Sequence, residues 1–191
     1  MRKGASERKT SEVEIRAGIN LDSPEYEIET GLPFFNHMVE SFSKHSGIGV
    51  DLFAKGDIEV DEHHTVEDTA ITFGLALKEA LGDKKGIKRF GDAMVPMDES
   101  ISTCAVDISG RGVFNYDGKI GNIDGFKGEN FYHFFDTMCR YSGLNVYLSV
   151  KGKNPHHMME ASFKAFGIAL KKAVKIVDDD DEVKSTKGKL D

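Results

Sequence analysis

Long apolar segments are missing from this 191-residue chain, and so is an apolar segment near its start. Its apolar stretches are far shorter than the roughly 20 residues that a membrane-spanning helix needs. Residues 1–11 are polar and lack the apolar core of a secretory signal. We therefore expect no membrane partner, and the cytoplasm is the predicted location.

Cysteine and positive charge are also scarce. The two cysteines, Cys104 and Cys139, form neither a disulfide framework nor a CxxC metal motif, so we interpret them as buried thiols in a reducing compartment. The net charge of −7 leaves no basic face that could dominate and bind nucleic acid. Part of this charge is the acidic run 178–182, which is typical of a solvent-exposed tail.

The sequence contains an internal repeat. A shift of 96 residues carries segment 46–52 onto 142–148, and His37 onto His133. A shift of 93 residues relates a second set of pairs: His63 and His156, His64 and His157, Glu67 and Glu160, Gly74 and Gly167. The change of shift predicts a deletion of three residues near 151–155.

Both halves show the same order of patterns. Helical spacing, then strand-like alternation, then a second helical segment with an N-cap occur in each half. These segments are 34–44, 48–54 and 61–81 in the first half, and 131–140, 144–150 and 154–174 in the second. Residues 94–116 alternate enough to predict two further strands, with Gly110 and Gly112 near their junction.

The expected fold class is therefore α+β, with antiparallel sheet packed against helices and two half-domains related by a pseudo-two-fold axis. We expect one domain over 1–191, made of repeats at about 1–93 and 94–177 and a polar C-terminal tail at 178–191.

Six of the seven histidines occupy matched positions in the repeat. Residues i and i+4 share a helix face, so His63 with Glu67, and His156 with Glu160, can each offer an imidazole and a carboxylate to one ion. The adjacent His64 and His157 point about 100° away, which indicates two ions. Imidazole and carboxylate ligands without thiolate suit manganese, with iron, cobalt or zinc as alternatives.

One histidine has no matched histidine, since Tyr141 occupies the position that corresponds to His45. His45 is therefore either a contact to the substrate or to a metal-binding residue, or a plain surface residue.

Four motifs carry a resemblance to a known family. They are LPFFNHM at 32–38, DEHHTVED at 61–68, GIKRFG at 86–91 and NPHHMMEASFKA at 154–165. With these motifs the chain resembles the imidazoleglycerol-phosphate dehydratases of histidine biosynthesis over nearly its whole length. Departures are small: Val13 replaces a common Thr, Glu62 a common Asp and Thr186 a common Ser, and segment 117–129 is compact.

The resemblance implies two manganese ions per subunit. One ion would be held by four residues: His37, His64, His156 and Glu160. The other would be held by their repeat counterparts: His133, His157, His63 and Glu67. The resemblance further implies that neighbouring subunits complete these sites in a homo-oligomer of about 24 subunits assembled from trimers.

The resemblance also implies the reaction, a metal-dependent carbon–oxygen lyase step that converts imidazoleglycerol phosphate to imidazole acetol phosphate. A carbon-bound proton must leave with no carbonyl beside it, so the imidazole ring, as a dimetal-bound imidazolate, is the expected electron sink. The expected catalytic residues are Glu12, His45, Glu67 and Glu160. The expected substrate contacts are Glu12, Arg89, Arg111, Lys164, Ser185 and Lys187. Glu12 is the candidate acid or base, and it has no visible partner in the repeat.

Two other classes of function remain open from the residues alone. A two-metal hydrolase would use paired ions, but such sites depend more on carboxylates than six imidazoles and two carboxylates do. A metal-storage shell would need no cationic anchor for a phosphate, whereas arginines and lysines accompany these motifs.

Overall fold

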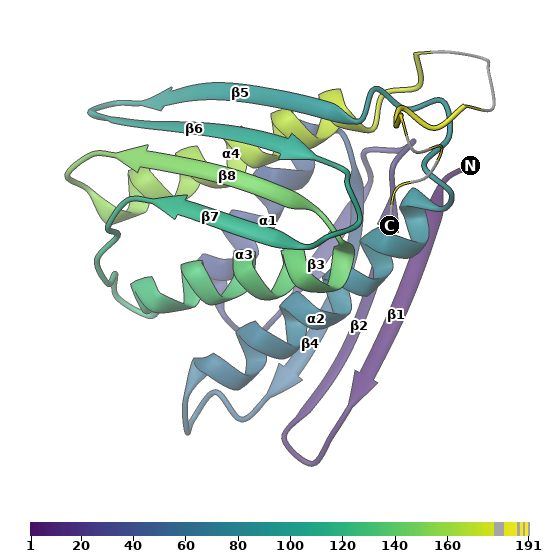
Figure 1. Cartoon of the computed structure of the whole chain (residues 1–191). Helices are drawn as coiled ribbons and strands as arrows, with labels where there is room; N and C mark the ends of the chain where they lie inside the picture. The colour runs from purple at the N-terminus through teal and green to yellow at the C-terminus, as the bar shows by residue number, and fades with distance from the viewer. Residues whose placement is uncertain (178–181, 187, 189, 191) are drawn as a thin grey trace.

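The computed structural model of the chain describes residues 1–177, 182–186, 188 and 190 (Figure 1). In chain order the elements are β1 (Lys3–Lys9), β2 (Val13–Asn20), β3 (Tyr26–Glu29), α1 (Pro33–Ser46), β4 (Gly49–Gly56), α2 (Glu62–Leu81), β5 (Phe90–Met97), β6 (Ser100–Asp107), β7 (Val113–Asp117), α3 (Gly128–Ser142), β8 (Asn145–Lys151) and α4 (Pro155–Ala173). In the described part of the chain, none of the helices combines the length and apolar character that a membrane span requires.

The strands form two sheets of four, in the orders β1-β2-β4-β3 and β5-β6-β8-β7. Most neighbours run antiparallel, as predicted, but β3 pairs with β4, and β7 with β8, in parallel. The prediction of two strands over 94–116 was wrong, because three strands cover this region. The two-residue turn Asp98-Glu99 interrupts the alternation so briefly that the sequence pattern continues through it, whereas Gly110 and Gly112 separate β6 from β7.

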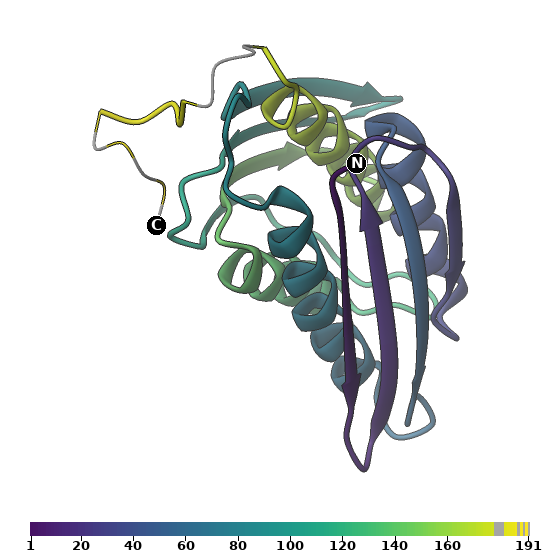
Figure 2. The same cartoon turned by 90° about the vertical axis from the view of Figure 1, so that its right-hand side faces the viewer.

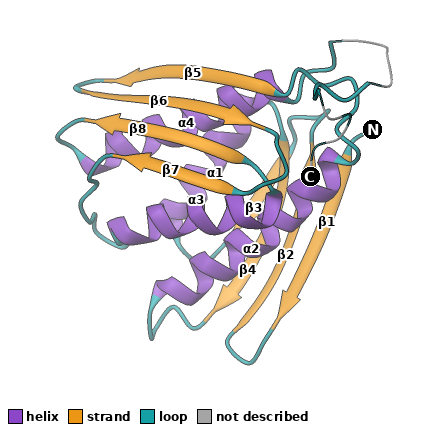
Figure 3. Cartoon of the chain, in the orientation of Figure 1, coloured by secondary structure: helices purple, strands orange, loops and turns teal. Residues whose placement is uncertain are grey.

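The four helices of the described residues lie between the two sheets. The helices α1 and α2 face the first sheet, α3 and α4 face the second, and the pairs meet in the middle, α1 against α4 and α2 against α3 (Figures 2 and 3). Phenylalanine rings lie in both contacts, for example Phe42 on α1 stacked on Phe166 on α4 with centroids 5.3 Å apart, and Phe73 on α2 edge-on to Phe134 on α3 at 6.0 Å. The α+β class with two similar half-domains is confirmed.

The glycines that the repeat matches lie where two helices approach each other closely. A Cβ added at Gly74 on α2 would lie 2.8 Å from the carbonyl oxygen of Met138 on α3. One added at Gly167 on α4 would lie 2.9 Å from the carbonyl oxygen of Phe42 on α1. Glycine at these positions therefore allows the backbones of the two helix pairs to touch.

The repeat extends further towards the N-terminus than the sequence suggested. A Cβ at Gly4 on β1 would collide with the backbone of Ala76, and one at Gly91 on β5 with that of Ala169, which is the counterpart of Ala76. The hairpins β1-β2 and β5-β6 therefore correspond, at a shift of 87 residues. The prediction that Glu12 has no internal partner was wrong, because this shift carries Glu12 onto Glu99.

The boundary between the halves follows from the same correspondence. The expected boundary at residues 93 and 94 falls inside β5, which pairs along its whole length with β6 of the second sheet. We propose that the halves meet between Leu81, where α2 ends, and Phe90. The predicted deletion of three residues is confirmed: β4 and its connection to α2 span 49–61, 13 residues, whereas β8 and its connection to α4 span 145–154, 10 residues.

Candidate metal centres

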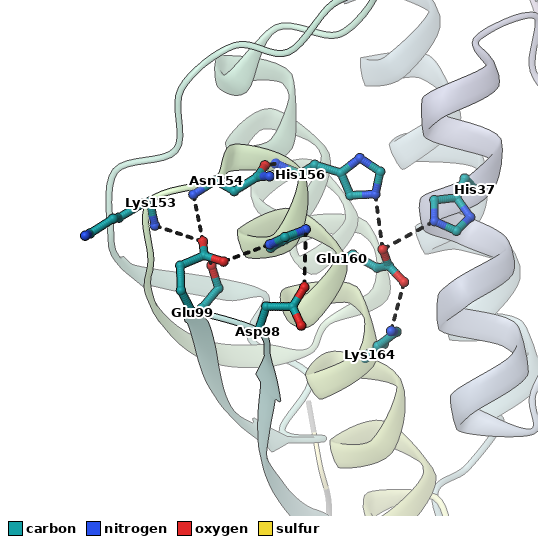
Figure 4. A network of polar contacts seen from close by, with 10 residues as sticks. His37, Asp98, Glu99, Lys153, Asn154, His156, Glu160 and Lys164 are labelled. Carbon is teal, nitrogen blue, oxygen red and sulfur yellow. Dashed lines mark hydrogen bonds and ion pairs between the residues drawn. The ribbon is translucent and has the colours of Figure 1, made fainter.

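Three of the predicted metal ligands meet where α1 and α4 begin. His37 comes from the first turns of α1, and His156 and Glu160 from the first turns of α4. The Nε2 atoms of His37 and His156 lie 3.4 Å and 3.2 Å from Oε2 of Glu160 (Figure 4). The three ligand atoms all lie within 4.8 Å of one another, so these residues could bind one ion.

The carboxylate of this cluster is buried and paired with a cation. Glu160 is 8% exposed, and Nζ of Lys164, one helical turn along α4, lies 2.8 Å from its Oε1. Burial raises the pKa of Glu160, but the hydrogen bond and charge of Lys164, followed by the contact with His37, outweigh it and lower that pKa below the usual value. Glu160 is therefore held ionised, with one oxygen facing the two imidazoles.

The repeat counterparts form a second cluster, whose carboxylate is more exposed than that of the first. His63 and Glu67 lie on α2, with Nε2 of His63 3.4 Å from Oε2 of Glu67. His133 on α3 packs edge-on against His63, with ring centroids 4.8 Å apart. The other nitrogen of His63, Nδ1, lies 3.2 Å from Oδ1 of the fully buried Asn130, whose amide donates to Glu62. This arrangement also leaves Nε2 of His63 for an ion.

The remaining two predicted ligands face other partners within the chain. Nδ1 of His64 lies 3.4 Å from Asp57 and 3.7 Å from Glu12. His157 lies against the β5-β6 turn, with Nδ1 2.8 Å from Glu99 and Nε2 3.7 Å from Asp98. The hydrogen bonds to Asp57 and to Glu99 raise the pKa of His64 and of His157 respectively. In each predicted set of four ligands, three residues therefore lie together, and the fourth, His64 or His157, lies apart from them.

Both clusters have the donor chemistry of a divalent metal site, but among the described residues only the first has its three ligand atoms within 4.8 Å of one another. Each combines two imidazoles and a carboxylate, the ligand types that manganese, iron, cobalt and zinc accept. On both α2 and α4 the same ring nitrogen, Nε2 of His63 or of His156, faces the carboxylate four residues further along the helix. A cluster of three protein ligands also leaves coordination positions for a further ligand.

The two predicted catalytic residues outside the clusters lie differently. Glu12 is in the turn between β1 and β2, with its carboxylate half exposed and facing His64. His45 is near the end of α1, exposed, with Nδ1 2.8 Å from the carbonyl oxygen of Ser41. It lies eight residues from His37, about 12 Å along the helix, and therefore away from the cluster of its own chain.

The predicted phosphate contacts gather in another place, with one exception. Arg89 forms a two-point contact with Asp107, at 2.8 Å and 3.3 Å, and its Nη1 donates to the carbonyl oxygen of Lys184. Arg111 lies 3.8 Å from the same Asp107 and is exposed. The contact with Lys184 places the neighbouring Ser185 beside Arg89, whereas Lys187 lies outside the described residues. The exception is Lys164, which lies in the first metal cluster.

The arginine group, which consists of Arg89 and Arg111, and the first metal cluster are at opposite ends of the second sheet. Arg89 immediately precedes β5. The turn that immediately follows β5 contacts His157, which is next to His156 of the first cluster. A strand of eight residues spans about 24 Å, which is longer than a small phosphorylated substrate. A single chain therefore cannot present both groups to one such molecule.

Sequence reasoning did not identify three polar residues that hold the histidines. Glu99, Asn130 and Asp57 contact His157, His63 and His64. They lie far from these histidines in sequence or in a connecting loop, and no spacing rule joins them. Glu99 could have been found by searching for the third shift of the repeat.

Comparisons with known proteins agree with the motifs. The sequence model of the family described as imidazoleglycerol-phosphate dehydratase matches residues 30–170. Relatives of that name from Methanosphaerula palustris and Archaeoglobus fulgidus are 47% and 48% identical, covering 100% and 96% of this chain and 100% and 97% of their own.

Two solved structures share the fold. The imidazoleglycerol-phosphate dehydratase from Staphylococcus aureus has a TM-score of 0.82 at 32% identity, covering 91% of this chain and 99% of its own. The enzyme from Pyrococcus furiosus, solved in complex with (S)-C348, has a TM-score of 0.84 at 33% identity, covering 96% and 99%.

Proposed function

Because the chain belongs to the imidazoleglycerol-phosphate dehydratase family, we propose that it removes water from imidazoleglycerol phosphate in histidine biosynthesis, with two divalent metal ions per chain. It is an enzyme, a carbon–oxygen lyase. The observation that carries the metal part of the proposal is the pair of clusters, each made of two imidazoles and one carboxylate at repeat-matched positions. Manganese is the expected ion, and other divalent ions fit the same donors.

We propose that a neighbouring copy completes each cluster. His37, His156 and Glu160 would take His64 of another chain as their fourth ligand, and His63, Glu67 and His133 would take His157. Two observations support this arrangement. His64 and His157 face away from the clusters of their own chain, and the arginine group lies a full strand length from the first cluster.

The reaction needs a sink for electrons that is not a carbonyl group. In the substrate the hydroxyl leaves the carbon attached to the ring and a proton leaves the next carbon, which gives an enol. The enol becomes the ketone by taking up a proton at the carbon attached to the ring and losing the proton of its own hydroxyl. A metal ion on each ring nitrogen would stabilise the negative charge that the ring carries during this process. Water exclusion, orientation and proton movement then fall to the side chains.

We assign these side chains as follows. Glu12 moves the proton at carbon, and His45 contacts the substrate from a neighbouring chain. Glu67 and Glu160 hold the ions that orient the ring. The phosphate is bound by cationic and hydroxyl groups: Arg89, Arg111, Lys164, Ser185 and Lys187. Asp107 holds Arg89 by a two-point contact, which would fix the orientation of its guanidinium before substrate arrives.

We further propose that the active form is a homo-oligomer of about 24 chains built from trimers. Its substrate is a small molecule, and we expect neither nucleic acid nor membrane as a partner. We expect it to work in the cytoplasm.

The test begins with protein stripped of metal by a chelator. We expect no formation of imidazole acetol phosphate until manganese is added, and about two bound ions per chain by elemental analysis. His63→Ala and His156→Ala should each lose about one ion per chain and abolish turnover. His45→Ala, which removes an imidazole outside both clusters, is the matched control and should keep both ions. Full activity in verified metal-free protein, or bound metal without turnover, would overturn the proposal.

A further inference from the structure

Glu99 is surrounded by hydrogen-bond donors although it lies in an exposed turn. Its Oε1 accepts from the backbone N–H of Lys153 at 3.2 Å, the backbone N–H of Asn154 at 2.8 Å and the hydroxyl of Ser100 at 2.8 Å (Figure 4). Its Oε2 lies 2.8 Å from Nδ1 of His157. The carboxylate therefore ties the β5-β6 turn to the start of α4, where His157 is located.

The counterpart of Glu99 in the first half has a different environment. Glu12 occupies the same place in the β1-β2 turn and faces His64, the counterpart of His157, but at 3.7 Å. Its side chain is 54% exposed, against 37% for Glu99. Each half thus places a glutamate beside the corresponding histidine. Glu99 is tightly hydrogen-bonded, whereas Glu12 is more exposed and can face a ligand.

We infer that Glu99 is a positioning residue, which fixes His157 by accepting a hydrogen bond from Nδ1 and so leaves Nε2 as the nitrogen that binds a metal ion. This inference rests on the proposed function, because it takes His157 to be a metal ligand. It assigns to Glu99 a role different from that of Glu12.

The assignment of the proton follows from elementary hydrogen-bond chemistry. An ionised carboxylate can only accept, so the nitrogen 2.8 Å from it must carry hydrogen. A neutral imidazole carries one hydrogen, and with that hydrogen on Nδ1 the lone pair is on Nε2. Histidine ligands are commonly fixed in this way by a carboxylate, and losing the carboxylate costs roughly 10- to 100-fold in metal affinity.

The variant Glu99→Gln separates orientation of the ring from anchoring of the turn. Its amide oxygen can still accept from the two backbone N–H groups and Ser100, which places the NH₂ group against Nδ1 of His157. The NH₂ group donates to Nδ1, so the neutral ring of His157 must carry its hydrogen on Nε2, which is the atom proposed to bind the metal ion. Glu12→Gln is the matched control, because it makes the same exchange at the corresponding position without these bonds.

The measurement is manganese binding to metal-free protein, by calorimetry and by metal content at set free manganese concentrations. In Glu99→Gln we expect one class of site to bind roughly 10- to 100-fold more weakly, so that about one ion per chain remains where wild type holds about two. Glu12→Gln should bind like wild type. Wild-type manganese binding by Glu99→Gln would overturn the inference and leave the proposed function intact, whereas failure of wild type to bind manganese would refute the metal sites themselves.

A second measurement needs no mutation at Glu99. Nitrogen-15 spectra of histidine-labelled, metal-free protein, with the His157 signals identified by their loss in His157→Gln, report which ring nitrogen carries hydrogen. At a pH where the ring is neutral, we expect Nδ1 of His157 to be protonated and Nε2 to be bare. A proton on Nε2 would overturn the inference even if Glu99→Gln failed to fold.

Discussion

Single residues distinguish the two metal clusters, although the repeat makes them look alike. Nδ1 of His63 is held by the amide of Asn130, whereas His156 packs edge-on against the ring of Phe34, with centroids 5.1 Å apart. Asn130 and Phe34 occupy matched positions. In the same way, Glu160 is paired with Lys164, whose counterpart in the first half is Ile71. The two ions are therefore expected to bind with unequal affinity, because a lysine pairs directly with the carboxylate of the first cluster.

Glu12 gives the residue-scale prediction. Glu12→Gln keeps the size and hydrogen-bonding capacity of the side chain but removes its basic oxygen. We expect the turnover rate constant to fall by roughly 10² to 10⁴, the usual effect of losing a general acid or base, while substrate binding is largely kept. Steady-state kinetics with parallel metal analysis and sedimentation would measure this. The variant should retain both ions and the assembly, and wild-type turnover would remove Glu12 from the mechanism.

At the scale of elements, the helix pairs depend on glycine. Gly74→Ala would normally stabilise a helix by roughly 0.5–1 kcal/mol, because alanine loses less backbone entropy on folding. Here its Cβ would lie 2.8 Å from the carbonyl oxygen of Met138, so α2 and α3 must move apart. We expect a net loss of about 1–3 kcal/mol in the free energy of unfolding, measured by urea denaturation of metal-free protein.

The control for this change is Lys78→Ala, on the exposed face of the same helix. It should shift the denaturation midpoint little. If Gly74→Ala raised the midpoint, the close approach of α2 and α3 would not constrain the fold.

At the scale of the whole molecule, the proposed sharing of ligands links metal to assembly. If two chains supply the ligands of one ion, the free energy of metal binding contributes to the stability of the interface. Chelation should therefore convert the large particle to smaller species, with trimers as the expected product, and manganese should restore it. Analytical ultracentrifugation tests this, and an unchanged particle after verified removal of the metal would contradict shared sites.

The repeat, the helices and the histidine–carboxylate pairs could all be predicted from the sequence. The i,i+4 pairs on α2 and α4 follow from helix geometry alone, because residues four apart lie on one face. The N-caps Asp61 and Asn154 each accept from the backbone N–H two residues on, as their positions predicted. Such features are local, so short segments of sequence suffice to specify them.

The contacts between these local features required the three-dimensional structure. It brings His37 to α4 and His133 to α2, since α1 and α3 pack against those helices from the other half of the chain. It also revealed that Glu99 is the counterpart of Glu12, because strand register preserves a correspondence that hairpin sequences have lost. The sequence could not fix these contacts, because they depend on how surfaces far apart in the chain pack together. A packed interface requires side chains of a suitable size and shape, and many different residues meet that requirement.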